Sequence, residues 1–131
     1  MVDNIKIVIS GDGPRGDTVT VIGTVYAKIT SANLTLAEVA GPHTVTNSGA
    51  TEEVIMVWPE LANGQEALFY VGDAYYLRVV AASGIKIRVG DVQSVETGYI
   101  RSKVVGNWLR IKAIQSELVV IGLGGIWSYD E

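Results

Sequence analysis

The chain has 131 residues, a formal net charge of -4 and no cysteine, which suits one domain and excludes a disulfide framework, a thiolate metal site and a cysteine nucleophile. Its 19 valines, 13 isoleucines and 9 threonines greatly outnumber its 8 leucines, and side chains branched at Cβ favour strands over helices. A helix bundle is therefore not expected. With 10 basic against 14 acidic residues and no basic cluster, we expect no nucleic-acid partner.

The N-terminal residues predict a β-hairpin with a long tip. Residues 5–9 begin with an apolar and polar alternation, and residues 10–17 contain the glycines and proline of a loop. Residues 18–21 then begin the return strand. The N-terminus lacks a basic region followed by an apolar core, and no apolar run approaches the ~18 residues of a membrane span. We therefore expect that the chain is made in the cytoplasm and does not associate with a membrane.

The next segment predicts further strands within the first 42 residues. Gly23 suggests a glycine bulge inside a strand that continues through residues 25–29. Residues 34–39 are predicted to form a strand, with one helical turn as the alternative. Pro59, later in the chain, cannot donate to a strand ladder and is expected to end the run before it.

From residue 43 onward, short apolar or alternating runs recur between glycines. The predicted strands are residues 43–46, 53–58, 67–71, 75–80, 85–89, 107–114 and 117–121. Two of these strands, 85–89 and 107–114, place Lys and Arg on alternate positions, so each should have one wet face. Turn glycines fall at intervals of roughly 6 to 12 residues, a spacing typical of sandwiches, barrels and β-helices.

This pattern predicts one all-β domain over residues 1–131. We expect an antiparallel β-sandwich or a jelly-roll-like fold, with a short β-helix or an intertwined trimeric β-prism as the alternative. No interval leaves room for a crossover helix between strands, so a parallel α/β sheet is not expected.

Motifs that resemble chemical sites fail their context tests. Residues 11–16 match the letters G-x-G-x-x-G, but Pro14 lies inside the loop and strand residues follow it, whereas a dinucleotide site needs a helix there. The Arg-Gly-Asp tripeptide at 15–17 carries too little information to assign a function. The loop that contains Asp12 and Asp17 lacks the D-x-D-x-D-G spacing of a calcium site.

Catalytic residues are not nominated by the sequence. His43 is the single histidine, it follows Gly41 and Pro42 at a strand start, and no serine lies in a G-x-S-x-G elbow. A structural or surface histidine is the favoured interpretation. The aspartates are scattered among turns, where solvated capping is their usual role. We therefore expect no enzyme activity, no cofactor and no metal.

Aromatic side chains are the best candidates for exposed or interface residues. An outward Tyr or Trp stacks on sugar or anchors a protein interface, although packing in the core or between subunits is the more usual role. Tyr75 and Tyr76 are adjacent, so they must point to opposite faces of a strand. The candidates are Tyr75, Tyr76, Tyr99, Trp108 and Trp127.

Strand and turn patterns recur in the following segments: 46–51 (TNSGAT), 54–59 (VIMVWP), 62–64 (ANG), 76–79 (YLRV), 81–90 (AASGIKIRVG), 98–100 (GYI), 105–106 (VG), 109–114 (LRIKAI), 119–122 (VVIG) and 125–127 (GIW). Through these segments, residues 43–128 resemble a β-rich domain that is common in structural proteins of tailed bacteriophages. Leu118 departs from the pattern, because the family often has Trp there. These are strand and turn patterns rather than a catalytic signature.

The resemblance implies a non-enzymatic virion protein that is generally homotrimeric. A chain of this length suits a capsid decoration (cement) protein that binds the major capsid protein and stabilises the assembled head, since a fibre needs a long shaft. The alternative is a tail-fibre or head-fibre module that binds a host glycan or receptor, and the third hypothesis is a small glycan-acting enzyme. The apolar N-terminal residues Val2, Ile5, Ile7 and Ile9 are candidate capsid contacts, because a terminal strand can augment a neighbouring sheet.

Overall fold

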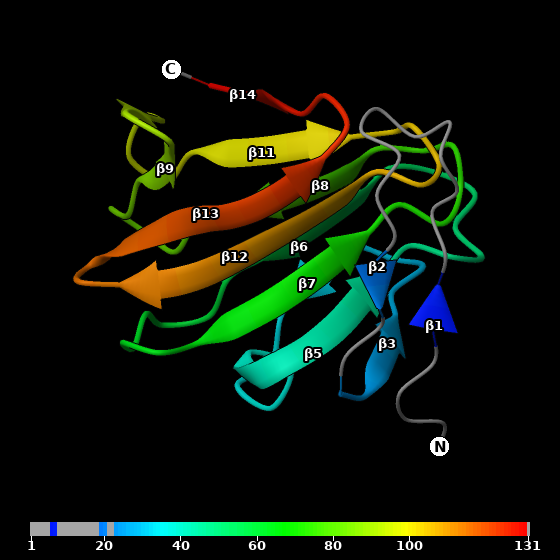
Figure 1. Ribbon diagram of the computed structural model, residues 1–131, viewed down its shortest axis with the longest axis horizontal. Coiled ribbons are helices and arrows are strands. Elements are labelled where there is room, and N and C mark those ends of the chain that lie inside the picture. Colours follow the sequence, from blue (N-terminus) through cyan, green and yellow to red (C-terminus); the bar gives the residue numbers. More distant parts are fainter. Residues whose placement is uncertain (1–5, 8–18, 21–22, 131) are drawn as a thin grey trace.

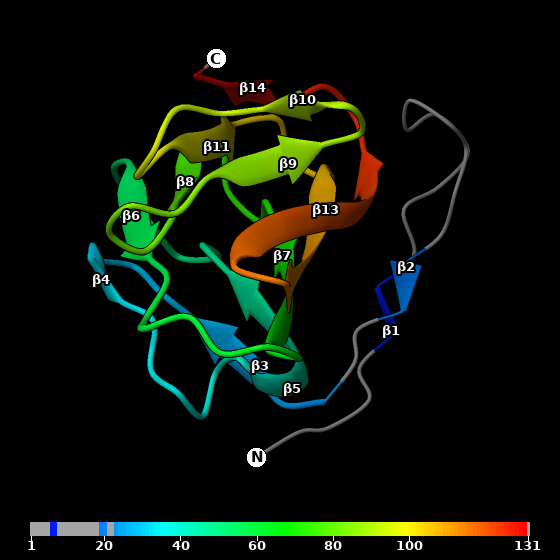
Figure 2. The same ribbon diagram turned by 90° about the vertical axis from the view of Figure 1, so that its left-hand side faces the viewer.

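The computed structural model describes residues 6–7, 19–20 and 23–130, and these residues form strands without a helix. Two sheets pack face to face as a β-sandwich (Figures 1 and 2). The larger sheet has the order β10 (Val92–Gln93), β9 (Ile87–Val89), β13 (Glu117–Gly124), β12 (Trp108–Ile114), β7 (Glu66–Tyr70), β5 (Ala40–Thr46) and β3 (Val25–Ala27). The smaller has the order β14 (Ser128–Tyr129), β11 (Tyr99–Ser102), β8 (Leu77–Val80), β6 (Val54–Val57) and β4 (Ala32–Asn33). The all-β sandwich predicted from the sequence is confirmed.

Both sheets are mixed rather than purely antiparallel. From β3 to β8 each successive strand lies in the opposite sheet, so strands two apart in the chain become parallel neighbours: β3 with β5, β5 with β7, β4 with β6 and β6 with β8. A strand of the other sheet thus serves as the crossover that parallel pairs need, in place of a helix. The β-helix alternative shares this winding over β3–β8.

The second half of the chain completes each sheet by antiparallel pairing. β11 pairs with β8 and β14, while β12 pairs with β7 and β13. β13 also pairs in parallel with β9. The return of the later strands in the opposite direction makes the domain a sandwich rather than a β-helix.

The core lies between the sheets and follows the alternation of the strands. In β12, Leu109, Ile111 and Ala113 are buried, whereas Arg110 and Lys112 keep contact with solvent, so the predicted wet face of this strand is confirmed. The facing sheet contributes side chains such as Met56 to the same core. The buried apolar side chains of both sheets form one continuous cluster, Trp58 and Phe69 included, with their ring centroids 6.3 Å apart.

The predicted strand over residues 34–39 is wrong. Residues 36–39 form a turn, with backbone bonds from Glu38 N to Thr35 O and from Val39 N to Leu36 O. The cause is a capping box: Thr35 Oγ1 accepts from Glu38 N (3.2 Å), and Glu38 Oε1 accepts from Thr35 N (2.8 Å). The T-x-x-E spacing carried this information in the sequence.

The expected bulge at Gly23 is a break between strands instead. β2 (Val19–Thr20) pairs with β1 (Lys6–Ile7) in a separate two-stranded sheet, whereas β3 belongs to the seven-stranded sheet. Gly23 has φ +62°, and a Cβ there would collide with Pro42 O and with the His43 ring. The antiparallel pairing of β1 with β2 confirms the predicted hairpin.

Candidate functional site

The outer surface of the five-stranded sheet gathers aromatic and basic side chains. Alternation buries Leu77 and Val79 of β8, so Tyr76 and Arg78 point outward. In β11 the same alternation leaves Tyr99 and Arg101 outward, because their neighbours Ile100 and Ser102 are buried. We call this surface the Tyr–Arg face, and its members are Glu53, Tyr76, Arg78, Tyr99, Arg101 and Lys103.

Strand register brings the two arginines together. Arg78 and Arg101 are directly opposite on the antiparallel pair β8 and β11. Side chains at such positions have Cβ atoms about 5 Å apart, and like charges there repel each other. Glu53, just before β6, lies between them: its Oε2 is 2.9 Å from Arg78 Nε and 3.8 Å from Arg101 Nη1. One carboxylate is therefore shared by two guanidinium groups.

The tyrosine rings hold the cations against the sheet. The Arg78 guanidinium carbon lies 4.5 Å from the centroid of the Tyr99 ring, and that of Arg101 lies 4.1 Å from the Tyr76 centroid and 5.5 Å from the Tyr99 centroid. Lys103 Nζ lies 5.0 Å from the Tyr76 centroid. These distances are those of cation–π contacts, which fix the orientation of the planar guanidinium groups.

Hydrogen bonding at the centre of the Tyr–Arg face is incomplete. Within the residues that the structure describes, the buried side-chain nitrogen and oxygen atoms without a hydrogen-bond partner are Glu53 Oε2, Arg78 Nε and Arg101 Nε. Arg78 Nε is close to Glu53 Oε2 but is not aligned for a hydrogen bond. All of these atoms belong to one surface. Unsatisfied buried polar groups are rare in folded proteins, and each calls for an explanation such as strain, a catalytic role, a water or an ion.

Two side chains outside the Tyr–Arg face position its tyrosines. Buried Asn47 accepts from Gly72 N (2.8 Å) and donates to Tyr75 O (3.0 Å), which fixes the loop that leads into β8. Asp130 Oδ1 accepts from Tyr99 N (2.8 Å) at the start of β11. The face is thus built on paired strands and on flanking segments that these hydrogen bonds hold.

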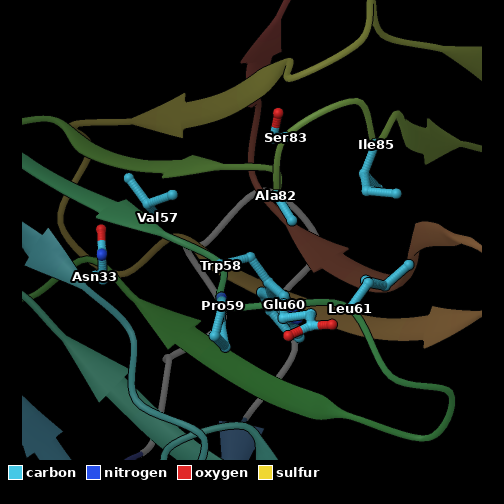
Figure 3. Close-up of a pocket in the computed structure, with 9 residues that line it drawn as sticks. All are labelled: Asn33, Val57, Trp58, Pro59, Glu60, Leu61, Ala82, Ser83 and Ile85. Atoms are coloured by element: carbon cyan, nitrogen blue, oxygen red, sulfur yellow. The ribbon is translucent and has the colours of Figure 1, made fainter.

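A cleft lies at the carboxyl ends of β4, β6 and β8 (Figure 3). It has a volume of about 530 Å³ and a mainly apolar lining that includes Val57, Pro59 and Leu61. Gln65 orders its rim, because Gln65 Oε1 accepts from Trp58 Nε1 (2.8 Å) and Gln65 Nε2 donates to Glu60 O (3.0 Å). The cleft is separate from the Tyr–Arg face.

The predicted aromatic candidates divide into three groups. Tyr76 and Tyr99 meet on the Tyr–Arg face, and Tyr75 beside them is 43% exposed. Trp108 lies on the other sheet and packs over two glycines of β13: a Cβ at Gly122 would lie 3.2 Å from Trp108 Cζ3, and one at Gly124 would collide with the indole. That ring therefore has a structural role.

Trp127 is a correction to the prediction of an exposed aromatic. It is 7% exposed and belongs to the core, and its Nε1 donates to Gly124 O (3.2 Å). The reason is that Trp127 lies in the loop between β13 and β14, where it packs into the core while its neighbour Ile126 stays 88% exposed.

The N-terminal candidates can be placed only in part. Ile7 lies in β1, where its backbone pairs with Val19. Val2, Ile5 and Ile9 lie outside the described residues, as do the glycine-rich loop at 11–16 and the Arg-Gly-Asp tripeptide. The proposed capsid contact through this segment remains a prediction.

His43 occupies a structural position. Its Nδ1 accepts from Thr24 N (3.0 Å), and its ring lies edge-on to Tyr26 with centroids 5.8 Å apart. Among residues 6–7, 19–20 and 23–130, no group of three or more His, Asp or Glu side chains could hold a metal ion. No helix in that part of the chain is long and apolar enough to cross a membrane.

The arginines of the Tyr–Arg face were missed by the sequence analysis. Residues 99–102 were not predicted as a strand, although Tyr99, Ile100, Arg101 and Ser102 alternate outward and inward. The alternation was the available signal, but inward positions of a strand are usually apolar, and the small polar Ser102 does not fit that pattern. The spacing of residues along the sequence does not show that β8 and β11 lie side by side.

The comparisons with known proteins give no relative. No protein-family model, no curated protein and no solved structure matches the chain.

Proposed function

We propose that the chain is a non-enzymatic binding protein of a tailed-bacteriophage particle, a decoration (cement) protein that docks on the assembled head through the Tyr–Arg face. The observation that carries the proposal is the clustering of Tyr76, Arg78, Tyr99 and Arg101, all half-buried, on the outer surface of one sheet. Tyr and Arg are enriched among the residues that dominate the binding energy of protein interfaces. The resemblance of residues 43–128 to phage structural domains is the reason for proposing that the partner is a bacteriophage particle.

A decoration protein stabilises the shell by mass action. It binds the assembled lattice and not the dissociated subunits, so its binding free energy is added to that of the lattice. The resemblance also implies a homotrimer, which would provide three copies of the Tyr–Arg face to one site. Light scattering on the purified chain measures this oligomeric state.

Immuno-electron microscopy of the particles tests the location. Label on the heads is the expected result. Label confined to isolated tails would contradict the proposal and favour a fibre module. The exposure of Tyr75, 43%, is the observation that favours this second candidate, because an open tyrosine ring can stack on a glycan.

Removal of residues 1–9 tests the predicted capsid contact through the N-terminal segment. Unchanged occupancy of the heads by the shortened chain would contradict that contact.

A further inference from the structure

We infer that the Tyr–Arg face binds neighbouring carboxylates of an acidic segment on the partner protein. The inference rests on the proposed function, because it takes this face to be a contact surface. The face carries the cations Arg78, Arg101 and Lys103 and the single carboxylate Glu53. Asp130, at its margin, is already engaged by Tyr99 N. In a chain whose net charge is -4, this surface is a local excess of positive charge.

The guanidinium groups have donors to offer. An arginine carries five N–H donors in a fixed fork that matches a carboxylate. Glu53 is the carboxylate within ion-pair distance of Arg78 and Arg101 among the described residues, and it satisfies neither Nε. Both Nε atoms are buried, but each arginine side chain is partly exposed, so a carboxylate that approaches from outside would accept charge-assisted hydrogen bonds from the outer Nη groups of the two forks. It would also relieve the repulsion between the two opposed arginines.

The stacking favours an anion over a neutral sugar. Tyr76 and Tyr99 each have a ring face beside a cation, at 4.1 to 4.5 Å. The ring surface left for a sugar is therefore reduced, whereas 25% of the Arg78 side chain and 27% of the Arg101 side chain remain exposed. The rings also hold the cations in place, so less side-chain entropy is lost on binding.

The small extent of the face favours a short acidic peptide segment over an extended polyanion. The cations occupy two neighbouring strands, β8 and β11, and the residue that follows β11. Beyond them the chain is more negative than its overall charge of -4, so a nucleic acid or a long sulfated glycan would meet repulsion. A pair of Asp or Glu side chains on a protein fits this extent of charge.

Titration of the full-length chain with an octaglutamate peptide tests the inference, with NMR chemical shifts of backbone amides and of arginine Nε–Hε groups as the readout. We expect saturable binding in which the Nε–Hε signals of Arg78 and Arg101 shift, and no binding of octaglutamine. The double variant Arg78→Gln/Arg101→Gln should bind at least tenfold more weakly. Arg101→Lys, which keeps the charge but loses the fork, should fall between this variant and the wild type.

The matched control is Lys86→Gln/Lys112→Gln, which removes the same charge away from the Tyr–Arg face. It should bind as the wild type does. Equal weakening by both double variants, or equal binding of octaglutamine, would overturn the inference. Tighter binding of heparin than of octaglutamate would overturn the choice of protein carboxylates. The melting temperature of each variant shows that it is folded.

Head occupancy separates this inference from the proposed function. If the chain binds octaglutamate through Arg78 and Arg101 but is absent from heads, the inference stands and the decoration function fails. If Arg78→Gln/Arg101→Gln decorates heads as fully as the wild type, the function stands and the inference fails.

Discussion

The arginines on the outer surfaces of the two sheets differ in how many carboxylate partners they have. On the seven-stranded sheet each arginine has its own carboxylate: Arg110 pairs with Glu66, and Arg88 Nε donates to Glu117 Oε1 (2.7 Å). On the five-stranded sheet Arg78 and Arg101 share Glu53. The paired arginines are explained by the stability of the fold, whereas the shared pair leaves polar atoms unsatisfied and is better explained by an external ligand.

The largest stability effect should come from breaking a pair on the seven-stranded sheet. Glu66 is nearly buried, with 10% of its side chain exposed. Arg110→Met keeps the apolar stem but leaves this carboxylate without its cation, so we expect a loss of about 2 kcal/mol in the free energy of unfolding, below the ~3–5 kcal/mol of a fully buried pair. Urea denaturation measures it. A loss below about 0.5 kcal/mol would contradict the structural role of this pair.

The matched change on the five-stranded sheet should have a smaller effect. Arg78→Met loses a cation–π contact worth about 0.5–1 kcal/mol, but it also removes the repulsion with Arg101. We therefore expect a change of less than about 1 kcal/mol in the free energy of unfolding, in the same urea experiment. A loss as large as that of Arg110→Met would erase the contrast between the two surfaces and favour a structural role for Arg78.

The smallest effect concerns pH. The hydrogen bond from Arg88 lowers the pKa of the Glu117 carboxyl below its ordinary value of 4.5, against a smaller opposing effect of burial. A carboxyl with a lowered pKa in the folded state stabilises the protein above its ordinary pKa, and this contribution is lost as the pH falls through the folded pKa. Thermal melts from pH 7 to pH 3 should therefore show a shallower acid loss for Glu117→Gln. Identical profiles would contradict this.

The local features of the fold were accessible from the sequence, and its long-range pairing was not. The alternation in residues 107–114 predicted the buried and wet faces of β12, and the bias towards branched side chains, together with the spacing of the turn glycines, predicted an all-β sandwich. The parallel winding of β3 to β8 depends on which strands meet across the core, and periodicity within one strand carries no record of its neighbour.

The candidate site illustrates the same limit. Tyr76 and Tyr99 were nominated singly, as outward aromatics, yet their importance comes from the arginines that stack on them. That arrangement requires β8 and β11 to be adjacent and in the register that opposes Arg78 to Arg101. Trp127 was misjudged because its inward direction is set by a loop, where the strand alternation no longer applies.

The winding of β3 to β8 has a consequence for synthesis on the ribosome. β7 and β8 are each paired on one side by an earlier strand, but their other partners, β12 and β11, come from the last third of the chain. A nascent chain that ends before residue 99 therefore has an open edge on both sheets, where unintended strand pairing can occur. We expect stable folding of this domain to begin only after β11 and β12 have left the exit tunnel.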